Sequence, residues 1–471
     1  MFHGGLLQHY AQRATPVDHR VEAFLSSEPR LTWVTLFLSD FPSADVSLAG
    51  GTLRDILLGR APQDLDLIVH GLDAAKLERW LQTHGAVSDG HSLFARFHFV
   101  PHGTALSSPV EIALAKTVID ARGPDFHACD TTVNSMSWRI RGQRLFDPDY
   151  GVYDLEKRLL RANGNPAVTL ASEPMRILRI LRQACELQFG IEQQTWNAIC
   201  RLAPMLTHTV QSEDGTHIYA VSRKRIGAEF LRGFLAHPAH LLKLWKESGL
   251  LALLFPELDD LSEIIERDSE TAWEKTLRAL EALFRPNLLR EHGKTSPPPD
   301  VLIATLFGFL PHHPERTAHR IGGKFHLNQF PSGHSLHVNG KNIITLLEQV
   351  NLFESEDPAA MRPSHFEKRF CHNLGENLLL AMHVHELALG IHRSSRDRFA
   401  VAKRMHTELC ERAKPYGGRL PKLLSGRDLE PLGIPSGPGY RDILSRVRDA
   451  QIAQIVSTKP EAITYVQMHL H

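Results

Sequence analysis

The sequence has no excess of charge of either sign, because its 471 residues contain 53 Lys and Arg against 53 Asp and Glu. No global field therefore draws the chain to a polyanion such as nucleic acid, and any such contact must come from local basic patches. Its five cysteines include no C-x-x-C pair. That spacing argues against a zinc ribbon and a disulfide framework, and it favours a reducing compartment.

Long hydrophobic runs are also missing. No run approaches the roughly 20 apolar residues of a membrane span, and the N-terminal MFHGGLLQHYAQR lacks the apolar core of a signal peptide. We therefore expect a cytoplasmic protein that makes no use of a membrane. The chain is long enough for several domains with cores of their own, and we find no internal repeat.

What is present is one stretch with the pattern of a ligand site, LAGGTLRDILLGRAPQDLDLIVH at 48–70. Gly50 and Gly51 predict a turn in which the backbone can come close to a ligand, because no Cβ stands in the way. A short helix is expected over Thr52–Leu58, followed by a buried strand over Leu65–Val69. The N–H groups of such a glycine turn can hold a phosphate group.

Two carboxylates mark the start of the predicted strand. Asp64 and Asp66 are two residues apart, so they point to the same face. Two like charges that close together repel each other unless a divalent cation lies between them. Together with the glycine turn they form a minimal site for metal-assisted nucleotidyl transfer. The alternative is a β-α-β packing unit that carries two surface aspartates.

The same stretch resembles the signature GG-x-x-R-D-x-L-L-G-x-x-x-x-D-x-D of the class II nucleotidyltransferase family that contains bacterial CCA-adding enzymes and poly(A) polymerases. The resemblance implies an α+β fold, in which a polymerase β-like head with a mixed sheet precedes an all-helical neck, body and tail. We expect a helical lead-in at 1–45, the catalytic head at 46–165, the base-reading neck at 166–260 and the RNA-binding body and tail at 261–471.

A third carboxylate is expected on the strand predicted over Val110–Lys116. Glu111 shares a face with Ala113 there, and it matches the family's third acidic position. The resemblance implies that Asp64, Asp66 and Glu111 hold two Mg²⁺ ions during transfer. The alternative for Glu111 is an ordinary glutamate of an edge strand.

The segment FHACDTTVNSMSW at 126–138 falls where the family has R-R-D-F-T-x-N-A, which helps to bind the ribose and triphosphate of the nucleotide. Asp130 and Asn134 match that pattern. Ala128 and Cys129 stand in place of the two arginines. The replacement removes two guanidinium groups that could donate in pairs to phosphate.

A helix with a basic stripe is predicted next, over Ser172–Phe189, with Ser172 as its N-cap. Arg176, Arg179 and Arg182 recur every three residues along one side of it. The alternative is a solvated helix face.

The family reads the incoming base in this segment. By resemblance, Glu173 accepts from the amino group of cytosine or adenine while Arg176 donates to the Watson–Crick edge. Ser172 and Glu173 stand where Glu and Asp are usual, so the sequence leaves the choice of base open. The resemblance implies nucleotide binding by Gly50, Gly51, Arg54, Asp130, Asn134, Glu173, Arg176, Arg179 and Arg225, and RNA binding by Arg179 and Arg182.

The implied function is template-independent addition of CMP and AMP, from CTP and ATP, to the 3′ end of RNA, with all or part of the CCA end of tRNA as the first expectation. A poly(A) polymerase or an A-only enzyme would share every catalytic residue. From another class, the chain could be an RNA-binding pseudo-enzyme whose nucleotide pocket has decayed, as Ala128 and Cys129 suggest. The intact carboxylates favour an enzyme.

Overall fold

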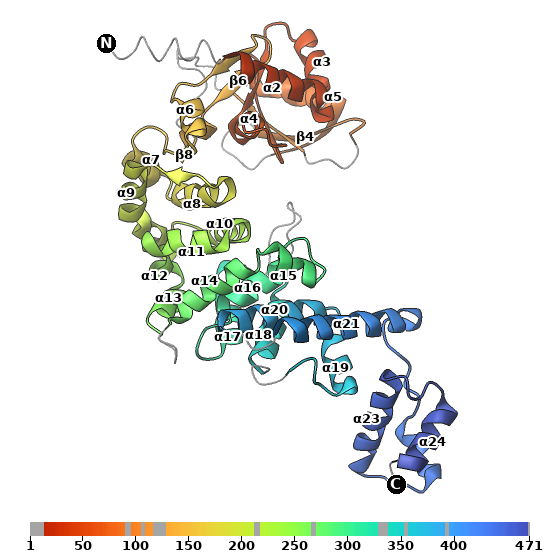
Figure 1. Cartoon of the computed structure of the whole chain (residues 1–471). Coiled ribbons are helices and arrows are strands. Elements are labelled where there is room, and N and C mark those ends of the chain that lie inside the picture. The colour runs from red at the N-terminus through yellow and green to blue at the C-terminus, as the bar shows by residue number, and fades with distance from the viewer. Residues whose placement is uncertain are drawn as a thin grey trace. The chain divides into compact units, whose positions relative to one another are not determined.

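The computed structural model describes residues 14–89, 96–104, 109–115, 129–211, 217–264, 270–327, 338–352, 357–390 and 395–469. The chain divides into two compact units, Met1–Val221 and Ser222–His471 (Figure 1). The division falls inside the segment predicted as the neck, and the finer boundaries at 45, 165 and 260 stay a prediction.

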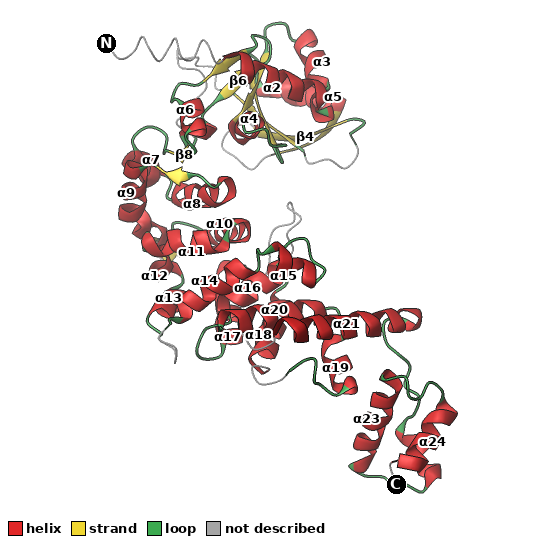
Figure 2. Ribbon diagram, viewed as in Figure 1, coloured by secondary structure: helices red, strands yellow, loops and turns green. Residues whose placement is uncertain are grey.

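The first unit is built on a mixed sheet, whose strands are yellow in Figure 2. Its seven strands have the order β3-β4-β5-β2-β1-β6-β7. Their bounds are β1 Asp45–Ala49, β2 Leu65–His70, β3 Gly85–Asp89, β4 Arg96–Pro101, β5 Val110–Leu114, β6 Ser137–Arg139 and β7 Arg144–Phe146. Only the pair β2 and β5 is parallel, and the other neighbouring strands of this sheet run antiparallel.

Helices and short two-stranded ladders complete this unit. They are α2 Ala14–Ser27, η1 Pro29–Leu31, α3 Trp33–Asp40, α4 Gly50–Leu57, α5 Ala74–His84, η3 Thr132–Asn134, α6 Gly151–Glu156, β8 Leu159–Leu160, α7 Pro166–Ser172, α8 Met175–Leu187, β9 Gly190–Ile191, α9 Gln193–Leu202, η4 Ala203–Thr207, β10 Thr209–Gln211 and β11 His217–Tyr219. The second unit is helical in its described residues, so the predicted α+β head followed by helices is confirmed.

An aromatic cluster fixes α3 and α5 against the sheet. Trp33 of α3 lies edge-on to Phe99 of β4, with ring centroids 5.2 Å apart. Phe37 packs edge-on against Trp80 of α5 at 5.0 Å. The Asp73 side chain caps α5 by accepting from Lys76 N–H. The aromatic side chains thus fill the contact between the sheet and helices α3 and α5. The polar groups of the site lie at the strand ends near α4.

The predicted N-cap at Ser172 is wrong. Ser172 is the last residue of α7, where its hydroxyl donates to the Thr169 carbonyl, and α8 begins only at Met175 after Pro174. The residue before a proline disfavours helical backbone, and Glu173 is accordingly extended, with φ −146° and ψ 91°. Two helices therefore meet at Glu173, whose side chain is left on the junction.

A close backbone contact locks the start of α6 onto η3. A Cβ on Gly151 would lie 2.3 Å from the Thr132 carbonyl oxygen and 2.8 Å from Met136 Cγ. We expect Gly151→Ala to destabilise the protein by about 1 to 3 kcal/mol, because backbone must shift to admit the methyl group. Thermal unfolding measures this loss. Gly142→Ala is the matched control, since nothing lies within 4 Å of the Cβ there, and equal midpoints for the two variants would contradict the contact.

The second unit consists of helices around several buried apolar layers. Their bounds are α10 Arg223–Ala236, α11 Pro238–Glu247, α12 Leu250–Leu254, α13 Pro256–Asp259, η5 Asp260–Ser262, α14 Ala272–Ala282, α15 Pro286–Glu291, α16 Pro299–Phe307, α17 Pro314–Phe325, α18 Gly340–Leu352, α19 Pro363–Phe370, α20 Gly375–Ala388, α21 Ser395–Ala413, η6 Lys414–Tyr416, α22 Gly426–Leu429, η7 Glu430–Leu432, α23 Gly439–Ile452 and α24 Lys459–His469. Among the described residues, no helix combines the length and the apolar character that crossing a membrane requires.

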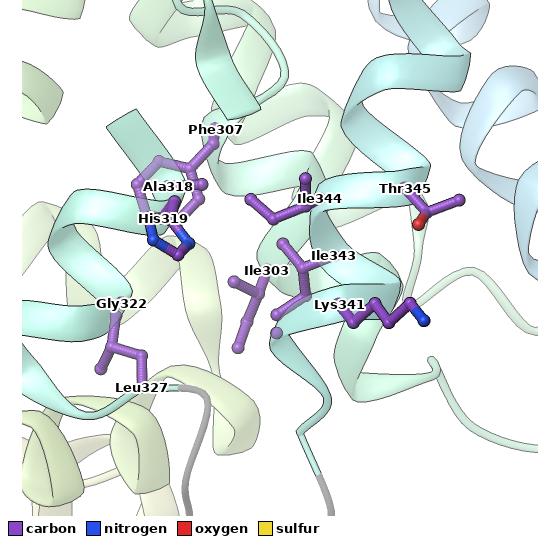
Figure 3. A pocket seen from close by; sticks show the side chains of 11 residues that line it. Ile303, Phe307, Ala318, His319, Gly322, Leu327, Lys341, Ile343, Ile344 and Thr345 are labelled. Carbon is purple, nitrogen blue, oxygen red and sulfur yellow. The ribbon is translucent and has the colours of Figure 1, made fainter. Parts of the chain in front are cut away.

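A mainly apolar pocket of about 340 Å³ opens in this unit between α16, α17 and α18 (Figure 3). Ile303, Phe307 and Ile343 line it, and His319 and Lys341 add polar atoms. Every lining residue belongs to the second unit, whereas the three carboxylates predicted for catalysis belong to the first.

A buried histidine makes the second unit sensitive to acid. His292 Nε2 lies 3.0 Å from His383 Nδ1, and burial lowers the pKa of His292 to about 3, with the neighbouring His383 as the next cause. Below pH ~6.5 an unfolded histidine takes up a proton while folded His292 does not, so stability falls with pH down to about 3.

We expect the unfolding midpoint of His292→Leu to fall less steeply than that of the wild type between pH 7 and about 4.5. Thermal melts at several pH values measure this slope. The control is His312→Leu, because His312 is exposed. Parallel pH profiles for the wild type and His292→Leu would contradict the assignment.

Candidate active site

The strand register brings two of the predicted carboxylates together. β2 and β5 are parallel neighbours in which Asp66 stands opposite Glu111. Asp64 directly precedes β2 and is exposed, whereas Asp66 is partly buried. The predicted acidic positions thus lie on adjacent strands at the same end of the sheet.

Crowding of negative charge is visible at Asp66. Burial raises the pKa of Asp66 to about 6, and the charges of Glu111 and Asp64 add to the rise. Arg96 and Arg54 oppose it only in part. A cation at this position would remove the repulsion and stabilise the ionised carboxylate.

The side chains are not drawn together as tightly as ligands around one ion. Glu111 is about half exposed, and its Oε1 lies 3.8 Å from His98 Nε2. In the described residues, no three His, Cys, Asp or Glu side chains form a group that could hold a metal ion as they stand. Glu111 would have to turn from His98 toward Asp66 to complete such a group.

The glycine turn lies against the same carboxylate. Gly50 has φ +60°, and its N–H donates to the Met136 carbonyl at 3.3 Å. A Cβ on Gly50 would stand 3.2 Å from Asp66 Oδ2. Both the left-handed backbone and the space beside Asp66 therefore require glycine. Helix α4 begins here, so Gly51 lies in the first helical turn, where N–H groups lack partners within the helix.

Thr52 is a functional candidate that sequence reasoning missed. It is buried, its hydroxyl accepts from Asp66 N–H at 2.7 Å, and it donates to the Asp64 carbonyl at 3.1 Å. One side chain therefore ties α4 to the segment that carries both aspartates. A threonine next to a glycine pair gives no distinct signal in a single sequence, because its partners lie 12 and 14 residues away.

Arg54 is held between two polar groups. Its Nε donates to Asp55 Oδ1 at 2.9 Å, and its Nη1 donates to Asn134 Oδ1 at 2.7 Å. A Cβ on Gly51 would lie 3.5 Å from the Arg54 guanidinium. The predicted nucleotide-binding residues Gly51, Arg54 and Asn134 therefore lie together beside the start of α4.

A second cluster joins the segment after β5 to helix α8. Asp130 Oδ1 lies 3.2 Å from Arg179 Nη1 and 3.4 Å from Arg176 Nε. Burial nevertheless raises the pKa of Asp130, since the two arginines compensate it only in part. Glu173 binds the same pair, at 3.4 Å from Arg176 and 3.2 Å from Arg179. The structure thus brings four predicted residues into one ion-pair cluster.

Helices α8 and α10 carry the other two predicted residues, Arg182 and Arg225. Arg182 pairs with Glu186 on its own helix, and Arg225 lies on α10 in the second unit. Arg176 is buried, so the arginine stripe is not a simple solvated face.

Of the two positions where the family has arginine, 128 and 129, the structure describes the second. Cys129 is half-buried, and burial, with the charge of Asp130, raises the pKa of its thiol to about 12. The thiol is therefore neutral near pH 7. Ala128 lies outside the described residues.

Comparison with known proteins gives two family matches in this chain. Residues 46–161 match the "Poly A polymerase head domain", and residues 188–261 match the family described as "Probable RNA and SrmB- binding site of polymerase A". The carboxylates, the glycine turn and Asp130 all fall within the first match.

Solved structures of low sequence identity share the fold. The Thermotoga maritima CCA-adding enzyme complexed with tRNA is 18% identical, with a TM-score of 0.61 over 96% of this chain and 98% of that one. The Bacillus stearothermophilus CCA-adding enzyme in complex with CTP is 20% identical, with a TM-score of 0.62 over 93% and 97%. This likeness extends to the helical part that the sequence pattern matched poorly.

Curated relatives match over part of their length. The CC-adding tRNA nucleotidyltransferase of Synechocystis sp. is 32% identical over 215 residues, which are 44% of this chain and 46% of the relative. The Multifunctional CCA protein of Neisseria gonorrhoeae is 28% identical over 285 residues, 54% and 63% respectively. The chain thus spans about half to under two thirds of the length of these relatives. In its head and neck, the chain is therefore similar to the nucleotidyltransferase family that contains the bacterial CCA-adding enzymes and poly(A) polymerases.

Proposed function

We propose that this chain is a template-independent nucleotidyltransferase that adds CMP and AMP, taken from CTP and ATP, to the 3′ end of tRNA. The register that sets Asp66 opposite Glu111, beside the glycine turn, carries the proposal. It gathers acidic side chains and the backbone of the two glycines at one end of a sheet. The relatives named as CC-adding and CCA proteins support tRNA as the RNA.

Magnesium fits this set of residues. Asp64, Asp66 and Glu111 offer only carboxylate oxygens, the ligands that Mg²⁺ prefers. The raised pKa of Asp66, caused by burial and then by the charges of Glu111 and Asp64, indicates a place where a cation would be stabilised. Bound Mg²⁺ would supply a more acidic 3′-hydroxyl and neutralise charge on the leaving pyrophosphate.

The protein's own groups would align the reactants. The RNA 3′-oxygen attacks the α-phosphorus of the nucleotide, and pyrophosphate leaves in line with it. Gly51 N–H at the start of α4 and the Arg54 guanidinium would hold the triphosphate. Arg54 then exchanges its contact with Asp55 for phosphate and keeps its hydrogen bond to Asn134.

Base reading would use the ion-pair cluster on α8. Glu173 accepts from the exocyclic amino group of cytosine or adenine, and Arg176 donates to the acceptor beside it. Glu173 already forms an ion pair with Arg179, and Arg176 already forms one with Asp130. An incoming base therefore has to compete with existing ion pairs, so we place nucleotide selection at the opening of this cluster.

Two alternatives remain distinct from this proposal. A poly(A) polymerase would use the same carboxylates and differ in the RNA that it extends. An RNA-binding pseudo-enzyme is favoured by Cys129 alone, because a neutral thiol replaces a phosphate-binding arginine there.

Primer choice separates these functions. Purified protein is incubated with Mg²⁺ and either CTP or ATP, using a tRNA that lacks CCA, a tRNA that ends in CC, and an unstructured oligo(A). We expect CMP on the first RNA, AMP on the second and no extension of the third. AMP addition to all three RNAs would indicate a poly(A) polymerase, and no addition to any RNA would overturn the proposal.

A further inference from the structure

One polar side chain interrupts the buried face of α8. Ile180, Leu181 and Ala184 are fully buried there, and Gln183 is only 4% exposed among them. A buried amide costs free energy unless its polar atoms are hydrogen-bonded. Gln183 therefore occupies this position because its contacts compensate the burial.

Its acceptor joins two residues of the segment after β5. Gln183 Oε1 accepts from Thr131 Oγ1 at 3.3 Å and from Asn134 Nδ2 at 3.2 Å. The other end of the Asn134 amide accepts from Arg54 Nη1 at 2.7 Å. A continuous chain of hydrogen bonds thus runs from α8 through Asn134 to the arginine beside the glycine turn.

The same helix carries Arg176, one of the two candidate base readers. Arg179 is one turn before Gln183 and binds Asp130, the neighbour of Thr131. Two successive turns of α8 therefore bind the segment 130–134. The first does so through the ion pair of Arg179 with Asp130, and the second through the hydrogen bond from Asn134 to the Gln183 amide. If the wrong base displaced α8, these contacts would displace Asn134 and Arg54 as well.

We propose that Gln183 is a positioning residue that couples nucleotide selection on α8 to the triphosphate-binding turn at the start of α4. The inference rests on the proposed function. Gln183 touches neither nucleotide nor metal, and it acts through Asn134 and Arg54. Through this coupling, the triphosphate is placed correctly only when the correct base is bound.

The test compares Gln183→Met with Gln183→Glu. Methionine has a similar length and no strong acceptor, whereas glutamate keeps an oxygen at the acceptor position. The readout is the ratio of kcat/KM for the preferred nucleotide to kcat/KM for UTP, on a tRNA that lacks CCA. A loss of folded enzyme cancels in this ratio, so a loss of stability alone leaves it unchanged.

We expect the ratio to fall about five- to tenfold in Gln183→Met, from the loss of hydrogen bonds to Thr131 and Asn134, and to return to within about threefold of wild type in Gln183→Glu. The control is Cys185→Ala, which removes a buried group from the same helix outside this network, and its ratio should match wild type. If Gln183→Met does not fold, Thr131→Val removes one donor to the same oxygen.

Each result decides the inference. An unchanged ratio in an active Gln183→Met enzyme overturns it, as does a fallen ratio that Gln183→Glu does not restore, because the role is then packing. If the wild type incorporates no nucleotide at all, the proposed function fails instead. The two failures are therefore distinguishable.

Discussion

Replacing Asp66 with asparagine should reduce nucleotidyl transfer below about a hundredth of the wild-type rate and, in the absence of divalent ions, raise the thermal unfolding midpoint. Activity is lost because an amide is a poor Mg²⁺ ligand. Stability rises because asparagine has nearly the same shape but no charge beside Glu111. Transfer above that level would remove the metal role from Asp66.

The pH dependence of this gain follows from the pKa of Asp66. Burial, then the charges of Glu111 and Asp64, raise it to about 6 from an ordinary value of 3.8, so the ionised carboxylate destabilises the folded state above pH 6. Below that pH the folded wild type takes up the proton and the disadvantage shrinks. The advantage of Asp66→Asn should therefore be largest above pH 6. Exposed Asp64 provides the control, since Asp64→Asn should lose transfer with little change in midpoint.

Restoring arginine at 128 and 129 should strengthen nucleotide binding. Two missing charge-assisted contacts, each worth roughly 1.5 to 3 kcal/mol, correspond to about one to four orders of magnitude in affinity. At position 129 the new guanidinium would enter a site where the charges of Asp130 and Asp66 act on the present thiol. We expect a lower KM for nucleotide in Ala128→Arg with Cys129→Arg, and transfer that still requires Asp66.

The double variant also separates an enzyme from a pseudo-enzyme. A pseudo-enzyme would stay inert or gain nucleotide binding without turnover. A variant that binds nucleotide worse than wild type would show that the native residues fill these positions productively. Equilibrium binding of CTP and ATP measures the first effect, and initial rates on tRNA measure the second.

Local spacing was sufficient to predict the head. Glycine and hydrophobic periodicity predict a turn, a helix and a strand from Gly50 to Asp66, and the structure has α4 and β2 there. The turn differs, because Gly50 and Gly51 are the first two residues of α4. The position of Glu111 beside Asp66 was reached from alternation on one strand together with the family pattern. The structure adds the strand register, in which Glu111 of β5 stands opposite Asp66 of β2, 45 residues earlier in the chain.

Residues with distant partners could not be predicted in this way. Serine is a typical N-cap residue, yet Ser172 is the last residue of α7, because that helix precedes it and Pro174 follows it. Thr52 and Gln183 matter through hydrogen bonds to strands and loops that only the folded chain brings near. Arg182 is a different case, because its partner Glu186 is only four residues away and the spacing alone permits this pair.

The most direct test of the account is the mass of a tRNA transcript that lacks its CCA end, after incubation with the protein, Mg²⁺, CTP and ATP. Asp64→Asn and Asp66→Asn serve as matched inactive proteins. The account predicts that the wild type increases the mass by whole CMP and AMP residues at the 3′ end, with CTP sufficient for the first additions, and that neither variant changes it. An unchanged mass with the wild type, while the tRNA still binds, would contradict the account.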